Sequence, residues 1–237
     1  MNRETIERLK RIQKAYDTTV KRYNDNIDPL VDVPVKFKQS QEFRAYTLYQ
    51  EGADNSSGAP DIREYLAPEP GMRFLDAGCC ANLANYHLYD WPSTYYGVDI
   101  SSLLIQAMER FVTQNNITIG GLWNSDIAQL SFEDHYFDIC AVIGVFEYST
   151  TSHMKFALRE LHRVLNPSSK VVMDIPNPEH PHVETMFRLE QYLGRPNILK
   201  SRVTCQKMIE TLFCIHRIDD SQVMIKYFLQ RKQGESL

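Results

Sequence analysis

The stretch FLDAGCCANLAN, Phe74 to Asn85, decides how the rest of the chain is interpreted. An apolar lead-in ends in an acid, Asp76, and small residues then turn the chain into a short helix-like segment. A buried parallel strand that ends in such a turn and enters a helix is how open α/β sheets form nucleotide sites. Gly78 would let the backbone approach a ligand with no side chain in the way. The stretch therefore predicts the first strand and the binding turn of such a sheet.

A second acid ends the next strand-like run, TYYGVDI. This acid, Asp99, comes 21 positions after Gly78. The spacing is close to the roughly 20 residues that separate the glycine turn from the ribose-binding acid in such folds. One acid before the glycine and another after it suit a ligand with an amino group and a ribose diol better than a pyrophosphate.

These motifs, with IGVFEY (143–148) and ELHRVLNPSSKVVMDIPN (160–177), resemble the class I S-adenosylmethionine-dependent methyltransferases. The likeness is greatest to the small-molecule (type 11-like) group, whose first motif reads LDxGCGxG, and Cys80 and Asn82 stand where that motif has glycines. The resemblance implies an α/β fold with a Rossmann-like, seven-stranded, mostly parallel sheet. An antiparallel last strand, helices on both faces and a helical cap belong to the same expectation. The implied cofactor is S-adenosyl-L-methionine.

The resemblance also implies roles for individual residues. Asp76 would interact with the methionine amino group, Asp99 would accept the ribose hydroxyls, and Asp126 would receive the exocyclic amine of adenine. A carboxylate suits a diol because its two oxygens can accept both hydroxyls. The remaining residues expected around the cofactor are Tyr16, Tyr23, Gly78, Cys80, Ile100, Ile127 and Ile143.

Two segments are expected to lie outside the core. The turn-rich stretch 51–61 separates an N-terminal helical lid or cap, residues 1–59, from a methyltransferase core, residues 60–237. A second cap is expected as an insertion at about 179–202. The N-terminal helix, residues 2–23, carries Tyr16 and Tyr23 near one face, where their rings could close over a sulfonium. The alternative is that this helix only covers an edge of the sheet.

Candidate catalytic residues follow the fourth strand and lie in the second insertion. Transfer of a methyl group from a sulfonium needs alignment, and a base helps where the acceptor is a hydroxyl or an ammonium. The candidates are Tyr148, His153 and His182, with Glu147 and His180 beside them. The alternative for each is a structural role.

Composition restricts the function. The chain has 237 residues, 43% of them hydrophobic and 24% charged, with a formal net charge of −4. No basic field would attract nucleic acid, and no apolar run approaches the roughly 20 residues of a membrane span. The five cysteines show no CxxC spacing and the N-terminal segment lacks the apolar core of a signal peptide, so we expect free thiols and a cytoplasmic protein.

We therefore expect methyl transfer from S-adenosylmethionine to an oxygen or nitrogen atom of a small-molecule acceptor, by a monomer or homodimer. One alternative is a non-catalytic adenosylmethionine-binding or interaction protein, because Cys80 and Asn82 replace glycines. Another is a methyltransferase that acts on RNA or protein. Metalloid chemistry at Cys79-Cys80 and a metal held by the HPH histidines are further alternatives, and no metal site is expected.

Overall fold

Seven strands form one sheet in the part of the chain that the computed structural model describes, residues 3–52 and 60–233. The strand order is β3-β2-β1-β4-β5-β7-β6. The bounds are β1 (Arg73–Ala77), β2 (Thr94–Asp99), β3 (Gly121–Asn124), β4 (Phe137–Val142), β5 (Leu165–Pro176), β6 (Phe213–Asp219) and β7 (Met224–Arg231). Strands β3, β2, β1, β4 and β5 pair in parallel, whereas β7 is antiparallel to both β5 and β6. The expected Rossmann-like, mostly parallel sheet with an antiparallel last strand is confirmed.

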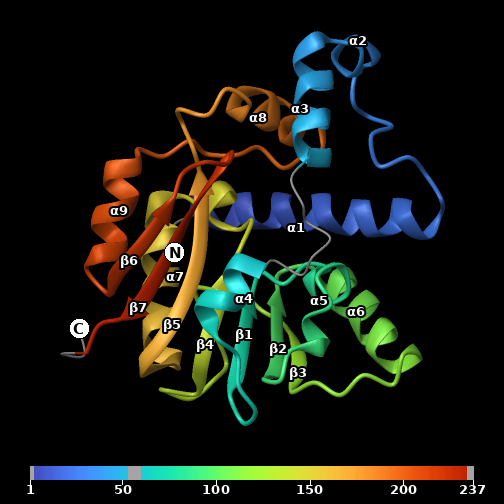
Figure 1. The fold of residues 1–237 in the computed structure, drawn as a ribbon. Coiled ribbons are helices and arrows are strands. Elements are labelled where there is room, and N and C mark those ends of the chain that lie inside the picture. Colours follow the sequence, from blue (N-terminus) through green and yellow to red (C-terminus); the bar gives the residue numbers. More distant parts are fainter. Residues whose placement is uncertain (1–2, 53–59, 234–237) are drawn as a thin grey trace.

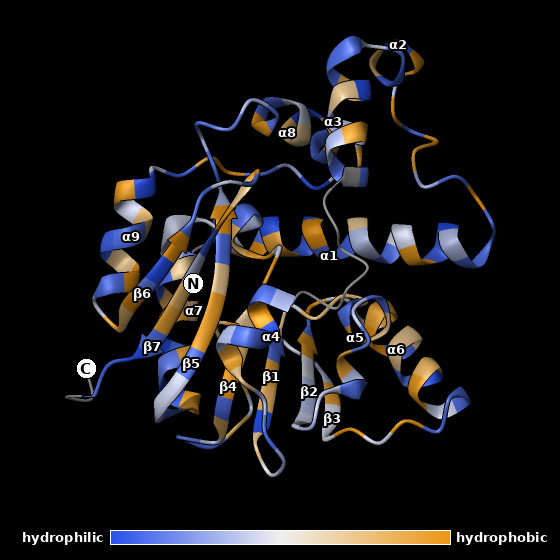
Figure 2. Cartoon of the chain, in the orientation of Figure 1, coloured by the Kyte–Doolittle hydropathy of each residue, from blue (hydrophilic) through white to orange (hydrophobic). Residues whose placement is uncertain are grey.

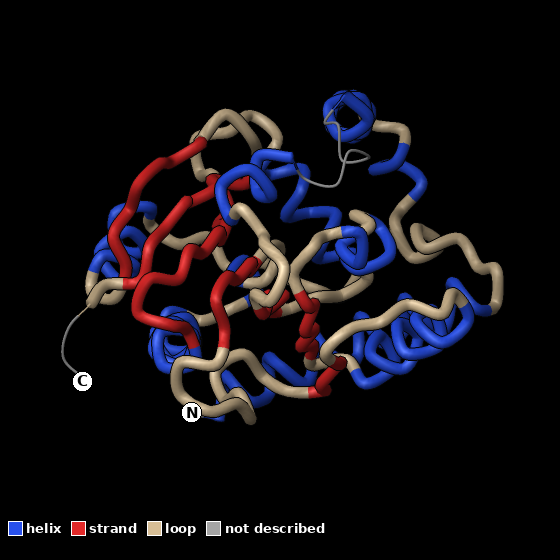
Figure 3. Tube along the Cα trace, turned by 60° about the horizontal axis from the view of Figure 1, so that its bottom comes forward, coloured by secondary structure: helices blue, strands red, loops and turns tan. Residues whose placement is uncertain are grey.

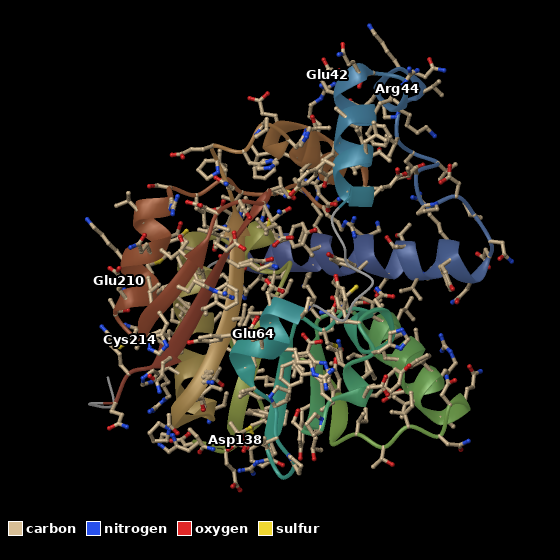
Figure 4. All side chains as sticks on the ribbon, in the orientation of Figure 1. Glu42, Arg44, Glu64, Asp138, Glu210 and Cys214 are labelled. Atoms are coloured by element: carbon tan, nitrogen blue, oxygen red, sulfur yellow. The ribbon has the colours of Figure 1, made fainter. Side chains whose placement is uncertain are left out.

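Helices cover both faces of this sheet (Figures 1 and 3). Their bounds are α1 (Arg3–Asn24), α2 (Val35–Lys38), α3 (Gln41–Gly52), α4 (Pro60–Leu66), α5 (Asn82–Asn85), α6 (Ser102–Gln114), α7 (Thr151–Val164), α8 (Val183–Tyr192) and α9 (Arg202–Glu210). Two short 3-10 turns are η1 (Leu88–Asp90) and η2 (Phe146–Tyr148). Among these, none is long and apolar enough to cross a membrane.

Alternation along the strands divides the core into two layers. In β1, Leu75 packs with α7 and α9, whereas Phe74 packs with α4, α5 and α6 on the opposite face. Successive strand residues point to opposite faces, so Asp76 shares the face of Phe74. Strand β4 is nearly all apolar at its centre (Figure 2), because both of its faces are buried.

The beginning of β5 has an unusual sequence for a strand. Asn166 to Ser169 is composed of residues typical of turns, yet the strand already begins at Leu165. The register shifts between Phe137 and Ile139, which accommodates the extra residues. Asn166 Nδ2 donates to Asp138 Oδ1 and Ser169 Oγ donates to the carbonyl of Phe137, so side chains hold this irregular segment against β4.

Helix α1 lies across the carboxyl ends of the parallel strands (Figure 1). Ser101 caps α6 by accepting from the Leu104 amide, and its hydroxyl donates to Asp17 Oδ1 on α1 at 2.6 Å. At the other side, Arg8 Nε donates to the Tyr148 carbonyl at 2.6 Å, and Arg8 Nη2 donates to the Pro196 carbonyl. The helix is therefore fixed above the sheet edge where open α/β sheets bind ligands. The expected domain boundary at residue 59 lies outside the described residues.

Candidate active site

A cavity of about 250 Å³ lies between this sheet edge and α1. The side chains of Leu9, Ile12 and Tyr16 line it from the helix. The other lining residues come from the ends of four strands and the segments that follow: Gly78, Cys80, Asn82, Tyr86, Asp99, Ile100, Asp126, Ile127, Ile143, Gly144, Val145, Glu147, Tyr148, Ser149 and His153. Residues that are distant in the sequence thus line one cavity.

The turn after β1 is bonded to β2. The amides of Gly78 and Cys79 both donate to the Val98 carbonyl, at 2.7 and 2.9 Å. Gly78 has a φ of +85°, and a Cβ at this position would overlap Val145 Cγ2. A glycine is therefore required at Gly78 for both conformation and space. Cys80 adopts a φ of +43°, the left-handed region where the related motif has glycine.

Asp99 is held by two backbone donors. Its Oδ2 accepts from the Cys80 amide at 2.9 Å and its Oδ1 from the Ser101 amide at 2.8 Å. Burial raises the pKa of Asp99, and these backbone hydrogen bonds partly oppose that shift. The carboxylate is fixed at the cavity wall, where its remaining lone pairs can accept from a ligand diol.

Asp126 is oriented by His153. Its Oδ1 lies 2.8 Å from His153 Nε2 and accepts from the Ala128 amide at 2.9 Å, whereas its Oδ2 is buried with no partner among the described residues. Burial alone would raise the pKa of Asp126, but the hydrogen bond and charge of His153 outweigh it and lower the pKa. A buried acceptor without a donor is costly unless a ligand supplies one.

The second ring nitrogen of His153 is also engaged. Nδ1 lies 2.9 Å from Ser149 Oγ, and the ring is buried. The prediction of His153 as a catalytic base does not fit this geometry, because neither ring nitrogen is available to a second molecule. The histidine is placed to hold Asp126.

Tyr148 lies in the cavity, as the sequence predicted, but its hydroxyl is shared. It donates to Glu190 Oε2 at 2.8 Å, and the Tyr16 hydroxyl donates to it at 3.3 Å. Burial raises the pKa of Tyr148 well above its ordinary value, so the phenol stays protonated and can donate a hydrogen bond. Arg195 packs over Tyr16 at 4.7 Å and pairs with Glu190, which connects the second insertion to α1.

Two predicted residues lie away from the cavity. The side chain of Tyr23 is 84% exposed. It shares a helix face with Tyr16, but seven residues of helix carry it about 10 Å farther along the axis. His182 packs against Tyr49 and His180, with ring centroids 5.0 and 5.5 Å apart, and does not line the cavity. It immediately precedes α8, which directs its ring toward α3.

Asp76 points to the other face of the sheet end. It is 1% exposed, accepts from Tyr95 Oη at 2.9 Å, and has Asn82 Nδ2 at 3.4 Å. Burial raises the pKa of Asp76 to about 7. It reaches the first cavity only through Asn82, which lines it.

Sequence reasoning did not identify Asn82, Tyr86 or Arg8 as site residues. Asn82 and Tyr86 are spaced i, i+4 from the start of α5, and that period could have placed them on one face. Arg8 gave no local signal, because its partners are carbonyls in distant segments.

The described part of the chain has no group of three or more His, Cys, Asp or Glu residues that could hold a metal ion. Cys79 is buried, so its thiol faces the core, and only Cys80 of the pair reaches the cavity. The geometry instead fits the expected cofactor. Oδ2 of Asp126, which has no partner among the described residues, provides a hydrogen-bond acceptor. Gly78 has no side chain, so a ligand can approach its backbone closely.

Residues 75–173 match the family model described as a methyltransferase domain. No curated protein matches the chain.

Three solved structures show the same fold at low identity. A SAM-dependent methyltransferase from Aquifex aeolicus has a TM-score of 0.57 and 14% identity, covering 81% of this chain and 100% of that one. A TehB-like SAM-dependent methyltransferase from Corynebacterium glutamicum has a TM-score of 0.56 and 17% identity, covering 80% and 95%. Geranyl diphosphate C-methyltransferase from Streptomyces coelicolor A3(2), in complex with S-adenosyl-L-homocysteine, has a TM-score of 0.62 and 13% identity, covering 81% and 85%. Residues 75–173 match a methyltransferase domain, and this match, the sheet order and the first-motif site together support a class I S-adenosylmethionine-dependent methyltransferase.

Proposed function

We propose that this methyltransferase transfers the methyl group of S-adenosylmethionine to an oxygen or nitrogen atom of a small molecule. The observation that carries the proposal is the convergence of Gly78, Asp99 and Asp126, whose Oδ2 is buried without a partner among the described residues, on one cavity. When bound, the cofactor supplies an electrophilic methyl group whose bonding electrons remain on sulfur after transfer.

We assign the cofactor contacts to residues that the cavity brings together. Asp99 is the acceptor for the ribose hydroxyls, and Asp126 Oδ2 is the acceptor for the adenine amine. Ile100 and Ile127, which line the cavity next to these acids, provide apolar surface for the ring. On the opposite side, Tyr16 and Tyr148 supply aromatic surface suited to a sulfonium.

A small acceptor is favoured because α1 covers the cavity. Ile12 is 2% exposed, and Arg8 and Asp17 bond α1 to both sides of the sheet edge. An RNA or protein segment would have to pass beneath this helix. The net charge of −4 also lacks the basic field that RNA binding uses. We assign residues 1–59 as the lid or cap and the 179–202 segment, which contains α8, as the second cap.

Isothermal titration calorimetry with S-adenosylmethionine and S-adenosylhomocysteine tests the cofactor site. Asp99→Ala should weaken binding by roughly 1.5–3 kcal/mol, the range for hydrogen bonds to a charged group. Asp134→Ala, at an exposed carboxylate paired with Arg163, is the matched control and should bind like the wild type. Absence of wild-type binding, or an unchanged affinity in Asp99→Ala, would falsify the assignment.

The rival functions are tested with S-adenosylmethionine labelled in its methyl group and a cell extract fractionated into RNA, protein and small molecules. Label in the small-molecule fraction supports the proposal. Label in RNA or protein overturns the small acceptor, and binding without any transfer indicates a non-catalytic protein.

A further inference from the structure

A second cavity of about 490 Å³ lies on the α4–α5 face of the sheet, at the same edge. The alternation of the strands explains its walls. Asp76 follows Phe74 by two residues on β1, and Asp174 follows Val172 by two on β5, so both acids stand above apolar residues of that face. Lys226 on β7 is the direct partner of Asp174 across the sheet.

Acidic groups outnumber cations in this cavity. Four carboxyl groups line it, and Lys226 is the one lysine or arginine among its described lining residues. Lys226 Nζ already donates to Asp61 Oδ2 at 2.5 Å, and Asp219 accepts from the Ser221 amide and hydroxyl. Neither Asp76 nor Asp174 forms an ion pair with any described lysine or arginine. One lysine, which pairs with Asp61 and whose charge also acts on Asp174, therefore faces four carboxyl groups, so the cavity carries an excess of acid.

Aromatic side chains complete the walls. Tyr49, Tyr86 and Trp91 line the cavity, and Tyr49 is fixed by donating to Gln222 Oε1 and accepting from the Val223 amide. Aromatic faces attract cations, most strongly where water is excluded. Carboxyl groups together with fixed rings are the surroundings that an organic ammonium prefers.

The second cavity adjoins the first. Asn82, Tyr86 and Ile143 line both. Next to Ile143, the Gly144 amide donates to Asp174 Oδ1 at 2.9 Å, and a Cβ on Gly144 would stand 3.7 Å from Glu147 Oε1. Asp174 and Glu147 therefore flank the same glycine from the two cavities.

Glu147 provides an independent indication of a ligand. Its side chain is 8% exposed and lines the first cavity, yet its Oε2 is buried without a partner among the described residues. Burial and the nearby Asp174 raise its pKa well above the ordinary value. A buried, unpartnered carboxyl oxygen next to a second buried acid is costly unless a bound donor satisfies it.

We propose that the methyl acceptor is a small organic amine, bound as an ammonium in the second cavity by Asp174 and presented past Gly144 to Glu147. The proposal rests on the proposed function, because it assigns the acceptor of that same methyl transfer. The aromatic walls select an amine that carries a ring or other apolar part, and the acids exclude anionic acceptors.

The reaction requires a buried acid to accept a proton from the ammonium. An ammonium has no lone pair, so its nitrogen gives up one proton before it forms the bond to the methyl carbon. The carboxylate form of Asp174 accepts that proton and later releases it to water. Burial raises the pKa of Asp174 to about 7, which suits a group that takes up and releases a proton near neutral pH.

The test uses the full chain saturated with S-adenosylhomocysteine and three probes of similar size. They are 2-phenylethylamine, the neutral 2-phenylethanol and the anionic 3-phenylpropionate. Calorimetry should show the amine binding at least about tenfold more tightly than the alcohol, with no binding of the acid. With S-adenosylmethionine, mass spectrometry should detect N-methylated amine. Equal affinity for amine and alcohol, or no binding of the amine, overturns the proposal.

Variants separate this proposal from the cofactor assignment. Asp174→Asn keeps an oxygen that can accept from the Gly144 amide, and it should lose at least about tenfold in amine affinity. Its affinity for S-adenosylhomocysteine should stay within about twofold of wild type, which also shows that it is folded. Asp134→Asn should change neither. If the wild type binds the cofactor but methylates the alcohol and not the amine, only the assignment of an amine acceptor is overturned. If the wild type does not bind the cofactor, the proposed function is overturned.

Discussion

His153 Nε2 lies 2.8 Å from Asp126 Oδ1, whereas Oδ2 of this cavity-lining residue is buried without a partner among the described residues. The pair connects the start of α7 to the segment after β3. A carboxylate fixed on one side in this way presents a single acceptor in a defined direction. That arrangement suits recognition of an amine hydrogen and disfavours a carbonyl oxygen at the same place.

We therefore expect Asp126 to discriminate between adenine and hypoxanthine. The wild type should bind S-adenosylhomocysteine at least about tenfold more tightly than S-inosylhomocysteine, which has a carbonyl in place of the amine. This corresponds to about 1.4 kcal/mol. In Asp126→Asn the two affinities should approach each other, because the amide can donate to the carbonyl. Calorimetry with both ligands measures this, and discrimination that persists in the variant would contradict the assignment.

Cys80 should carry backbone strain that glycine relieves. Its φ of +43° lies in the left-handed region, where a non-glycine residue costs roughly 1–2 kcal/mol. We expect the free energy of unfolding of Cys80→Gly to equal or exceed that of the wild type. Cys80→Val should be less stable than the wild type, because a branched Cβ tolerates this conformation least. Urea denaturation gives the order. A valine variant as stable as the glycine variant would exclude strain at this position.

Asp174 should make the ligand-free protein less stable as pH rises. Burial raises its pKa from 3.8 to about 7, so the folded state binds this proton more tightly than the unfolded state does. The stabilisation is complete below about pH 4 and is lost as pH rises through 7. Asp174→Asn should therefore exceed wild type in stability at pH 8, by on the order of 1–4 kcal/mol, and match it at pH 4.

Thermal melts between these two pH values test the Asp174 prediction. Asp134→Asn serves as the control, because its carboxyl group is exposed. A stability difference between wild type and Asp174→Asn that does not change with pH would show that Asp174 does not retain its proton on folding.

Arg8 should slow the release of the cofactor product. It donates to the carbonyls of Tyr148 and Pro196, and so fixes α1 over the cavity. Arg8→Ala should accelerate dissociation of S-adenosylhomocysteine by about tenfold, in line with loss of charged hydrogen bonds. Arg3→Ala, on the same helix with its partner Glu7 and largely exposed, is the control. Equal rates of S-adenosylhomocysteine release from both variants in stopped-flow measurements would show that α1 does not restrict release from the cavity.

The sheet and its first binding turn were predictable because one short motif combines a buried strand, a glycine and an acid. Asp99 and Asp126 could be predicted as candidate binding residues, because each acid ends or follows a strand-like run. Tyr23 was misplaced for a physical reason: helical periodicity gives the face of a residue and not how far the underlying sheet extends. Asp76 was predicted at the cofactor site but lines the second cavity, and Asp174 was not predicted as a site residue. Asp174 and Glu147 lie near each other because β4 and β5 are neighbours, and local sequence does not give that order.

Three successive amides at the turn after β1 already have acceptors within the protein. Those of Gly78 and Cys79 donate to Val98, and that of Cys80 donates to Asp99. The turn is thus ordered during folding, and its conformational entropy is not lost again when a ligand arrives. In native-state hydrogen exchange these amides should be protected even in the ligand-free protein, like those of the central strands. The turn at Gly78 and the side chain of Asp99 should therefore keep the same conformation with and without ligand. We expect ligand-dependent changes in amide protection mainly in α1.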